Sequence, residues 1–364
     1  MMVNNNDSEH LNFENSNEPG TSVLAPEFFL KEAEKYPVID VRTPAEFAQG
    51  HIPGAINMPI FSNEERAVVG TLYKKEGRDT AVLKGLEYVG PKMVEFARSA
   101  QRIALDNSVL VHCWRGGMRS GSMAWLFGTV GLNTTTLEGG YKAYRASFRK
   151  MLAEQKWRFM VIGGPTGGGK TEVLKELKSH GEQILDLEGL ANHKGSAFGA
   201  LGEAEQPTSE QFENDIHDCF LKFNPDRIIW VEGESHSIGR VYIPDQLFEL
   251  LMQAPLVMYD IDRKLRVERL VRDYGCFDKD LLRQSVLKIQ KRLGGQRTNE
   301  ALEALDAGDY HSVADLTLKY YDKGYAKSLA KRNEPVLVLN EIKDEPGNVA
   351  RKLIKQFSHE DNRY

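Results

Sequence analysis

The sequence is poor in cysteine and has no long apolar runs, and both absences restrict what the protein can be. Three cysteines occur in 364 residues, at Cys113, Cys219 and Cys276, and no two of them form a C-x-x-C pair. A disulfide framework or a cysteine zinc site is therefore not expected. No window approaches 18 consecutive apolar residues, which argues against a membrane-spanning helix. The first residues lack the basic and apolar regions of a secretory signal, so we expect a cytoplasmic protein without a membrane partner.

Charge is nearly balanced overall, with a formal net charge of −5, but it is distributed unevenly. Residues 1–30 contain five acidic residues and no lysine or arginine, and we predict a disordered acidic tail over residues 1–20. Residues 263–297 contain eleven lysines and arginines against four acidic residues. A second basic stretch, residues 319–332, is interleaved with Tyr320, Tyr321 and Tyr325. Such stretches are either solvated helix faces or surfaces that follow a phosphate backbone and stack on bases, and the sequence leaves both readings open.

After the tail, short apolar segments alternate with helical patterns, which predicts an α/β fold with parallel sheets. We expect strands at residues 38–41, 108–112, 159–162, 183–187, 227–231, 256–259 and 335–339. Helices are expected at residues 92–104 and 122–128 and from Lys170 onward, with a polar helical connector at residues 149–156. The length suggests two domains, which we place at residues 21–148 and 149–364, the second ending in a helical basic part.

A cysteine loop, HCWRGGMRSG at residues 112–121, follows one of these strands and precedes a helical pattern. Backbone N–H groups and the positive end of a helix would favour a thiolate at Cys113 and would also bind an anion. Gly116 and Gly117 allow the loop to bend, and Arg115 and Arg119 add positive charge. Cys113 is therefore the predicted catalytic residue. The predicted anion-binding loop consists of Trp114, Arg115, Gly116, Gly117, Met118 and Arg119.

Three more segments accompany this loop: DVRTPAEF at residues 40–47, GHIPGAINMP at 50–59 and LEGGY at 137–141. Together they resemble the rhodanese domain, which carries sulfur or selenium on its cysteine, and they predict a rhodanese-like domain over residues 21–148. The loop also fits the H-C-x-x-G-x-x-R-[ST] pattern of cysteine-dependent phosphatases. Its seven residues from Cys113 to Arg119 are one more than in a usual sulfurtransferase loop. The local pattern does not separate the two chemistries, although residues 40–59 favour the rhodanese architecture.

A second motif, GPTGGGKT at residues 164–171, matches G-x-x-x-x-G-K-[ST] between an apolar strand and a helix. Its glycines let backbone amides face phosphate oxygens, and the Thr171 hydroxyl can reach Mg²⁺. The predicted phosphate-binding residues are Gly164, Gly167, Gly168, Gly169, Lys170 and Thr171. This context predicts a kinase-like P-loop domain, with Glu232 as a carboxylate at the end of a neighbouring strand. A basic lid would be formed by Arg263, Arg266, Arg269 and Arg272, which could equally meet an RNA backbone or a diphosphate.

A rhodanese-like domain followed by a P-loop domain, with DLEGLANHKGS at residues 186–196 and WVEGES at 230–235, resembles the tRNA 2-selenouridine synthase family over nearly the whole chain beyond the tail. The resemblance implies conversion of 2-thiouridine at the tRNA wobble position into 2-selenouridine through S-geranyl-2-thiouridine. Geranyl diphosphate and selenophosphate would be the substrates, and selenium would be held on Cys113. The P-loop would grip the diphosphate, with Mg²⁺ as a helper at Thr171 and no tightly bound cofactor. The implied partners are tRNA and a supply of selenophosphate.

Further candidate site residues follow predicted strands or lie in glycine-rich loops, where α/β sites are built. They are Asp186, Glu188, His193, Lys194, Glu232, Glu234, His236 and Arg240. The alternative function is a cysteine-dependent phosphatase or sulfurtransferase fused to a nucleotide-binding, kinase-like domain. One hypothesis links the two readings: a loop of phosphatase size suits selenophosphate, because this donor itself resembles a phosphate ester.

Overall fold

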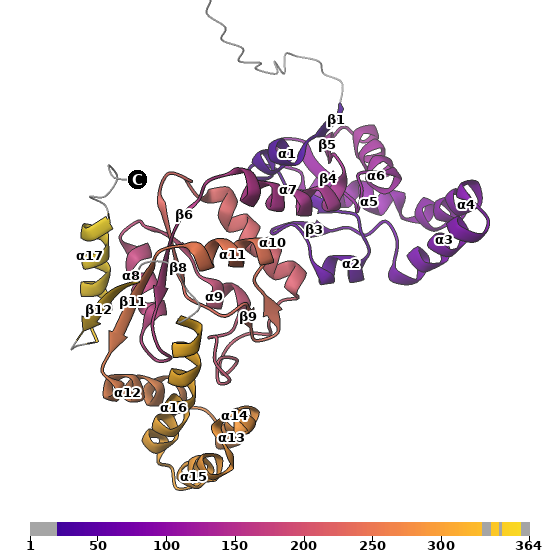
Figure 1. Ribbon diagram of the computed structural model, residues 1–364. Coiled ribbons are helices and arrows are strands. Elements are labelled where there is room, and N and C mark those ends of the chain that lie inside the picture. The colour runs from indigo at the N-terminus through magenta and orange to yellow at the C-terminus, as the bar shows by residue number, and fades with distance from the viewer. Residues whose placement is uncertain (1–19, 330–335, 342–343, 358–364) are drawn as a thin grey trace, which may run out of the picture. The chain divides into compact units, whose positions relative to one another are not determined.

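The computed structural model describes residues 20–329, 336–341 and 344–357, and the chain divides into two compact units between Ser147 and Phe148 (Figure 1). Apart from Gly20, the predicted acidic tail lies outside the described residues, as do residues 330–332 of the second basic stretch. Helix α7 (Gly140–Glu154) runs across the boundary. The connector expected at residues 149–156 is therefore mostly the end of this helix and not a separate element.

The first unit is built on a five-stranded parallel sheet of order β1-β5-β4-β2-β3. Its strands are β1 (Thr21–Leu24), β2 (Val38–Asp40), β3 (Ile56–Asn57), β4 (Ser108–His112) and β5 (Asn133–Leu137). The strand predicted at residues 108–112 is confirmed at both ends, and the one predicted at residues 38–41 ends one residue earlier. Because β4 is the central strand, the loop that follows it emerges at the middle of the sheet edge where α/β sites form.

The helices of this unit are α1 (Pro26–Ala33), α2 (Pro44–Gln49), α3 (Asn63–Lys75), α4 (Arg78–Val89), the short 3₁₀ turn η1 (Gly90–Lys92), α5 (Met93–Ile103) and α6 (Met118–Thr129). Helices α3 and α4 pack against each other and project away from the sheet (Figure 1). Val109 and Val111 of β4 share a core with Phe96 of α5 and Phe127 of α6. Helix α6 begins four residues before the predicted start, because tertiary packing overrides the low helix propensity of residues 120–122. The first turn of α6 therefore forms the C-terminal part of the cysteine loop.

The second unit contains another five-stranded parallel sheet, of order β12-β11-β6-β8-β7. Its strands are β6 (Arg158–Gly163), β7 (Gln183–Leu185), β8 (Ile228–Glu232), β11 (Leu256–Ile261) and β12 (Val336–Glu341). All five predicted strands are present, so the predicted parallel α/β fold is confirmed. Strand β7 stops two residues early because Asp186 caps the short helix α9 (Leu187–Ala191). The sequence did not predict the small hairpin of β9 (Ser237–Ile238) and β10 (Val241–Tyr242).

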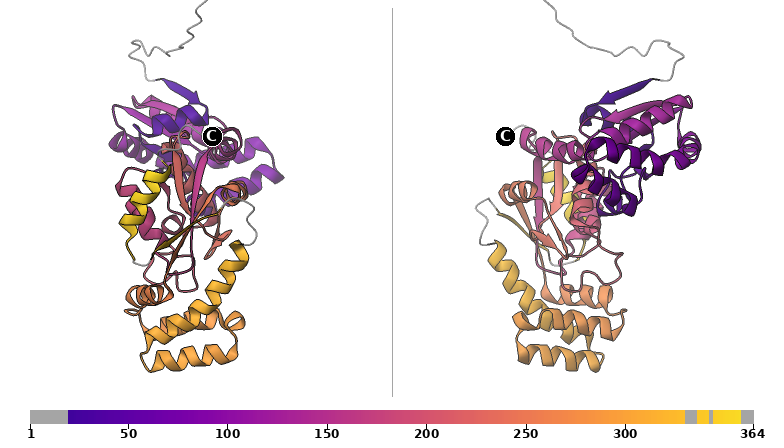
Figure 2. Two further views of the ribbon diagram at one scale, coloured as in Figure 1. Left: turned by 60° about the vertical axis from the view of Figure 1, so that its left-hand side comes forward. Right: turned by 90° about the vertical axis from the view of Figure 1, so that its right-hand side faces the viewer.

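Both faces of this second sheet are covered by helices (Figures 1 and 2). Met160 and Ile162 of β6 belong to a core with α8 (Lys170–Ser179) and α17 (Pro346–Phe357). The intervening residues Phe159 and Val161 belong to the opposite core, with α10 (Ser209–Lys222) and α11 (Asp245–Gln253). Successive residues of a β-strand point to opposite faces of the sheet, so residues of β6 alternate between the two cores. The second unit therefore has three layers, with the sheet between two layers of helices.

Five further helices gather beyond one end of the second sheet (Figure 2). They are α12 (Arg263–Tyr274), α13 (Lys279–Lys288), α14 (Gln290–Leu293), α15 (Gly295–Asp306) and α16 (Tyr310–Leu329). Since α12 begins just after β11 ends, this group lies at the carboxyl end of the parallel strands. Phe198, Leu282, Leu305 and Val313 are part of their shared core. In the described ranges of the chain, none of the helices is both long and apolar enough to span a bilayer.

Candidate functional sites

Cys113 lies at the carboxyl end of β4, at the base of an exposed loop. The residue is only 3% exposed, and its Sγ lies 3.3 Å from the Oγ of Ser120 in the first turn of α6. The Ser120 Oγ also lies 3.1 Å from the carbonyl oxygen of Gly117, and its single proton points to the sulfur when Cys113 is a thiolate. Ser120 was quoted in the sequence motif but was not predicted as a site residue. Its place in the [ST] position of the phosphatase pattern was the signal that could have found it.

The surroundings of Cys113 favour its thiolate. Burial acts to raise the pKa of this thiol, but the net shift is downward because other groups stabilise the negative charge. These groups are the hydroxyl and backbone N–H of Ser120, the backbone N–H of Arg115 and the guanidinium of Arg119. In contrast, burial raises the pKa of the Cys219 thiol in α10 to about 11. Cys113 is therefore suited to act as a nucleophile, and Cys219 is not.

The first turn of α7 holds the cysteine loop from behind. The N–H of Tyr141 donates to the carbonyl oxygen of Cys113 at 2.9 Å, and the next N–H donates to the carbonyl oxygen of Trp114 at 3.0 Å. Gly140 has a φ of +62°, and a Cβ at this position would overlap the Cys113 carbonyl oxygen and the Gly116 nitrogen. The second glycine of the LEGGY segment is therefore required by packing, because a side chain at residue 140 would push the cysteine loop away.

Beneath the loop, a buried ion pair ties several segments of the first unit together. The Arg42 guanidinium donates to the Asp40 carboxylate at 2.6 Å and to the Gly50 carbonyl oxygen at 2.7 Å. It also lies 3.7 Å from the ring centroid of Tyr141. The Nε2 of His112 lies 3.7 Å from Asp40, but burial lowers the pKa of His112 to about 4. At neutral pH His112 is therefore uncharged and supports the loop, together with the Asp-Val-Arg segment.

One arginine of the predicted anion-binding loop, Arg119, already has an acidic partner. Arg119 Nη1 lies 2.9 Å from Glu46 Oε2, and the same carboxylate accepts from the Thr43 N–H at the start of α2. Burial acts to raise the pKa of Glu46, but the hydrogen bond and charge of Arg119 make the net shift downward. Trp114 and Met118 are 36% and 52% exposed, and Arg115, Gly116 and Gly117 are also exposed. The Trp114 ring lies 5.8 Å from the ring of Tyr141, in a tilted contact.

The second site begins at the carboxyl end of β6, where residues 164–171 connect this strand to α8. Gly167 and Gly169 have φ values of +74° and +85°, which favour glycine. The Nζ of Lys170 donates to the Gly164 carbonyl oxygen at 3.3 Å. Lys170 is the first residue of α8, as predicted, so the loop amides lie at a helix N-terminus suited to phosphate.

Three of the predicted carboxylates converge beside the P-loop hydroxyl. Thr171 Oγ1 lies 3.2 Å from both Glu188 Oε2 and Glu232 Oε2. One oxygen from each of Glu188, Glu232 and Glu234 lies within 4.8 Å of the others. Glu188 lies in α9, Glu232 ends β8 and Glu234 follows two residues later. Because the set consists of hard oxygen donors, it can hold a cation such as Mg²⁺.

The three carboxylates of this cluster have raised pKa values, because they are buried close together. Burial and the neighbouring Glu234 raise the pKa of Glu188 to about 8. Burial and the charges of Glu188 and Glu234 raise the pKa of Glu232 well above its ordinary range, and burial raises that of Glu234. Burial opposes the charge on Lys170, but the three carboxylates raise its pKa overall. Glu232 is 1% exposed, and its Oε1 has no hydrogen-bond partner within the described residues. A proton or a bound cation can balance this charge.

Other predicted residues have different partners. Asp186 caps α9 by accepting the Gly189 N–H at 2.8 Å. The Nζ of Lys194 lies 3.1 Å from Glu203. His236 lies 2.9 Å from Asp245 and packs against the rings of Tyr242 and Phe248. Asp186, Lys194 and His236 thus each have a partner within the second unit.

His193 and Arg240 lie on a polar cavity of about 730 Å³. Burial lowers the pKa of His193. Other walls of the cavity carry basic and aromatic residues from the two basic stretches. They include Lys288, Arg292, Tyr320 and Tyr321. Arg292 Nη1 donates to Tyr320 Oη at 3.0 Å, so the fold brings the two basic stretches into contact.

Each arginine of the expected basic lid is paired with an acidic residue, so an anion that binds there must compete with a carboxylate. The pairs are Arg263 with Asp315 at 2.7 Å, Arg266 with Asp322 at 2.7 Å, Arg269 with Glu172 and Asp344, and Arg272 with Asp273 at 3.0 Å. Most of these partners lie on α8, on α16 or near α17, far from α12 in the sequence. Sequence spacing therefore gave no sign of them.

The fold and the two sites define an enzyme with a rhodanese domain followed by a P-loop domain. A rhodanese-like domain model matches residues 26–147, and a model described as the tRNA 2-selenouridine synthase AAA domain matches residues 157–356. The tRNA 2-selenouridine synthase of Bdellovibrio bacteriovorus is 35% identical over 84% of this chain and 92% of its own length. That of Bordetella petrii is 34% identical over 90% of this chain and 96% of its own. The chain belongs to the tRNA 2-selenouridine synthase family.

Among solved structures, an N-terminal domain from Clostridium difficile 630 is 42% identical over 35% of this chain and 98% of its own, with a TM-score of 0.32.

Proposed function

We propose that this protein converts 2-thiouridine at the wobble position of tRNA into 2-selenouridine through S-geranyl-2-thiouridine. Geranyl diphosphate supplies the geranyl group, and selenophosphate supplies selenium that is carried on Cys113. The related enzymes are named for making 2-selenouridine in tRNA. The observation that carries the proposal is the presence in one chain of a thiolate-stabilising loop and a P-loop whose hydroxyl faces a carboxylate cluster.

The first step uses the P-loop. The thiocarbonyl sulfur of the uridine attacks C1 of the geranyl group, the C–O bond breaks, and diphosphate leaves with the electron pair. The loop amides and Lys170 stabilise the charge that develops on this leaving group. Thr171, Glu188 and Glu232 are the residues that would hold Mg²⁺, which when bound supplies further positive charge for the diphosphate. Alkylation turns the sulfur into a thiolate leaving group for the second step.

The second step uses the cysteine loop, and its products depend on which atom of selenophosphate Cys113 attacks. If the Cys113 thiolate attacks selenium, an S–Se bond forms, the Se–P bond breaks, and phosphorus leaves at the phosphite level. Delivery to C2 then requires another thiol to cleave the S–Se bond. If the thiolate instead attacks phosphorus, hydrogen selenide is released directly and water later frees phosphate. Detection of selenium bound to Cys113 together with phosphite would support the first route, in which Cys113 carries selenium. Detection of phosphate and a phosphorylated Cys113 would instead support attack on phosphorus.

Contacts to tRNA are assigned to the polar cavity of the second unit. Arg240, Lys288 and Arg292 provide positive charge for phosphates, and Tyr320 offers an aromatic face for stacking. Of the two interpretations left open for the basic stretches, this assignment takes the one in which they follow a phosphate backbone and stack on bases. Its support is that residues from both stretches line one cavity.

The experiment uses the full chain with tRNA that contains 2-thiouridine, and nucleosides are analysed by mass spectrometry. Geranyl diphosphate with Mg²⁺ should give the S-geranyl nucleoside, and added selenophosphate should give 2-selenouridine. Cys113→Ser should retain geranylation and lose selenation, while the matched control Cys219→Ser should retain both. Normal selenation by Cys113→Ser would refute the role of this cysteine. Hydrolysis of an aryl phosphate without any change to tRNA would favour the phosphatase alternative.

A further inference from the structure

The solvent-facing side of helix α6 and the cysteine loop before it expose large aromatic and apolar side chains. Trp125 and Met118 are 61% and 52% exposed. They are seven residues apart, so they lie on one face of the helix, about 10 Å apart along its axis. Trp114, in the loop, is exposed as well. The chain has four tryptophans, and the two that are exposed both lie within residues 114–125, beside the nucleophile.

The surface next to these side chains is open. Gly117 and Gly121 lie between the two exposed tryptophans in the sequence, and a Cβ at either position would meet no atom within 4 Å. Ser122, one turn before Trp125 on the same helix face, is also exposed. Between Met118 and Trp125 this face therefore carries only small side chains, and it has room for a flat ring.

The charge around this surface is positive. Residues 107–137 contain Arg115 and Arg119 and no acidic residue. Arg119 already has a carboxylate partner, whereas Arg115 is exposed and forms no ion pair with any residue that the structure describes. The N–H of Lys142 donates to the Trp114 carbonyl oxygen at 3.0 Å, and this lysine is likewise exposed and lacks an acidic partner in the described ranges. Two unpaired cations thus flank an exposed tryptophan.

Aromatic rings beside unpaired cations suit single-stranded RNA. Unpaired bases stack on aromatic side chains, and the phosphates that join them bind lysine and arginine. A stable protein–protein interface buries about 800 Å² on each side, which is more than three side chains on one helix and a loop provide. Cys113 is only 3% exposed, so an acceptor nucleoside must lie directly on the cysteine loop to react there. Its neighbouring bases then come to lie on the loop and on α6.

We propose that Trp114 and Trp125 form an RNA-binding face of the first unit, on which unpaired bases next to the target nucleoside stack while that nucleoside reacts at the cysteine loop. Arg115 and Lys142 bind the phosphates between these bases. The inference rests on the proposed function and adds an RNA contact to the one assigned to the second unit. All four are positioning residues, because they hold the RNA and do not touch the reacting atoms.

Photocrosslinking to the full chain locates the stacked bases. The RNA is a hairpin of the anticodon stem and loop, in which 5-iodouridine replaces in turn each nucleotide next to the target nucleoside. After irradiation, crosslinked peptides are identified by mass spectrometry. An iodinated base forms adducts with an aromatic ring on which it stacks, so we expect adducts on Trp114 or Trp125. Adducts confined to residues 148–364 would overturn the RNA-binding face.

Steady-state kinetics with tRNA that was geranylated beforehand gives a second readout. Trp125→Ala should raise the KM for tRNA about tenfold and change kcat by less than about twofold, because a stacking contact is lost and the chemistry is not. Trp125→Phe keeps a ring and should recover most of this loss. Ser122→Glu places a negative charge on the same face and should also raise KM. Leu86→Ala and Val94→Glu, exposed on α4 and α5, are the matched controls and should keep the wild-type KM.

The outcomes separate this face from the proposed function. An unchanged KM in both Trp125→Ala and Ser122→Glu, with 2-selenouridine still formed, would overturn the face and leave the function standing. Adducts on Trp114 or Trp125 in a chain that makes no 2-selenouridine would support the face and overturn the function. Wild-type kinetics of both variants with purified substrates, together with loss of 2-selenouridine in cells, would assign the face to a protein partner and overturn the RNA contact.

Discussion

Arg119 Nη1 lies 2.9 Å from Glu46 Oε2, so the cation nearest the cysteine loop's C-terminal end is paired before any anion arrives. A phosphate-like donor must share or take over this guanidinium from the carboxylate. The pairing also fixes the position of Arg119, since Glu46 is held at the N-terminus of α2 by its capping box. The arginine is therefore positioned in advance for an anion on Cys113.

The first prediction concerns this arginine. Arg119→Ala should lower the rate of selenium transfer from selenophosphate at least tenfold, because one charge-assisted contact to the donor is lost. Geranylation of tRNA should be unchanged. The measurement is 2-selenouridine formed from tRNA that was geranylated beforehand. Arg102→Ala, on the exposed side of α5, serves as the control, and equal rates for both variants would refute the role of Arg119.

The second prediction concerns the ionisation of Cys113. In a Cys276→Ser background, the alkylation rate of Cys113 should rise with pH around a midpoint below that of N-acetylcysteine, because the loop stabilises the thiolate. Ser120→Ala should move this midpoint upward, since one hydrogen bond to the sulfur is lost. Cys219, with a pKa of about 11, should not interfere. A midpoint unaffected by Ser120→Ala would show that the hydroxyl does not stabilise the thiolate.

The third prediction concerns the turn behind the loop. Gly140→Ala should destabilise the first unit by about 3 kcal/mol, because its Cβ would overlap the backbone of residues 113 and 116 in addition to the left-handed strain. Gly131→Ala is a matched control: its φ is +92°, but a Cβ there meets nothing within 4 Å. It should cost about 1 kcal/mol. Urea unfolding measures both changes, and similar values would contradict the close approach.

The fourth prediction concerns acid stability. His112 has a pKa of about 4 in the folded chain, below its ordinary value of 6.5, so the unfolded chain binds this proton first. The contribution is fully present above pH 6.5 and is lost as the pH falls toward 4, to a total of about 3 kcal/mol. Amide exchange in β4, measured at pH 7 and pH 5, should show this loss. His112→Gln should make the protection of β4 less dependent on pH, and an unchanged dependence would contradict the assignment.

The fifth prediction concerns the carboxylate cluster. Glu232→Gln should weaken Mg²⁺ binding by about 10-fold or more, because one oxygen ligand loses its charge. Mg²⁺ must displace a proton from Glu188, whose pKa is about 8, so binding should strengthen as the pH rises from 7 to 9. Calorimetry in two buffers measures affinity and proton release. Glu249→Gln, exposed on α11, should behave as wild type, and a similar loss in that variant would argue against a specific site.

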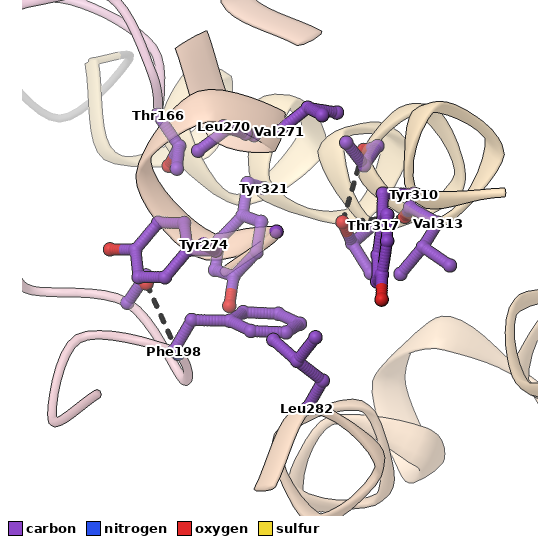
Figure 3. Close-up of a pocket in the computed structure, with 13 residues that line it drawn as sticks. Thr166, Phe198, Leu270, Val271, Tyr274, Leu282, Tyr310, Val313, Thr317 and Tyr321 are labelled. Carbon is purple, nitrogen blue, oxygen red and sulfur yellow. Dashed lines mark hydrogen bonds between the residues drawn. The ribbon is translucent and has the colours of Figure 1, made fainter. Parts of the chain in front are cut away.

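The sequence alone predicted where the cysteine loop and the P-loop lie between a strand and a helix, because the residues of each loop are contiguous and their conformations are local. It also proposed Glu188, Glu232 and Glu234 separately. Their convergence depends on β7 lying next to β8 in the sheet, which no local pattern encodes. An apolar cavity lined by Thr166, Phe198, Leu270, Leu282 and Val313 (Figure 3) could not be predicted, because these residues come from stretches that are far apart in the sequence. The ion pairs of the lid arginines could not be predicted for the same reason: the positive charge was visible in the sequence, and its acidic partners were far away along the chain.

The ion pairs of Arg266 and Arg269 have a consequence for how the P-loop responds to ionic strength. Under the proposed function, a diphosphate that binds at the P-loop replaces the carboxylate partners of these arginines, so its binding releases few counterions. Added salt should therefore weaken diphosphate binding only slightly, while it weakens tRNA binding steeply. The two substrates of one reaction would then be separable by the concentration of salt alone.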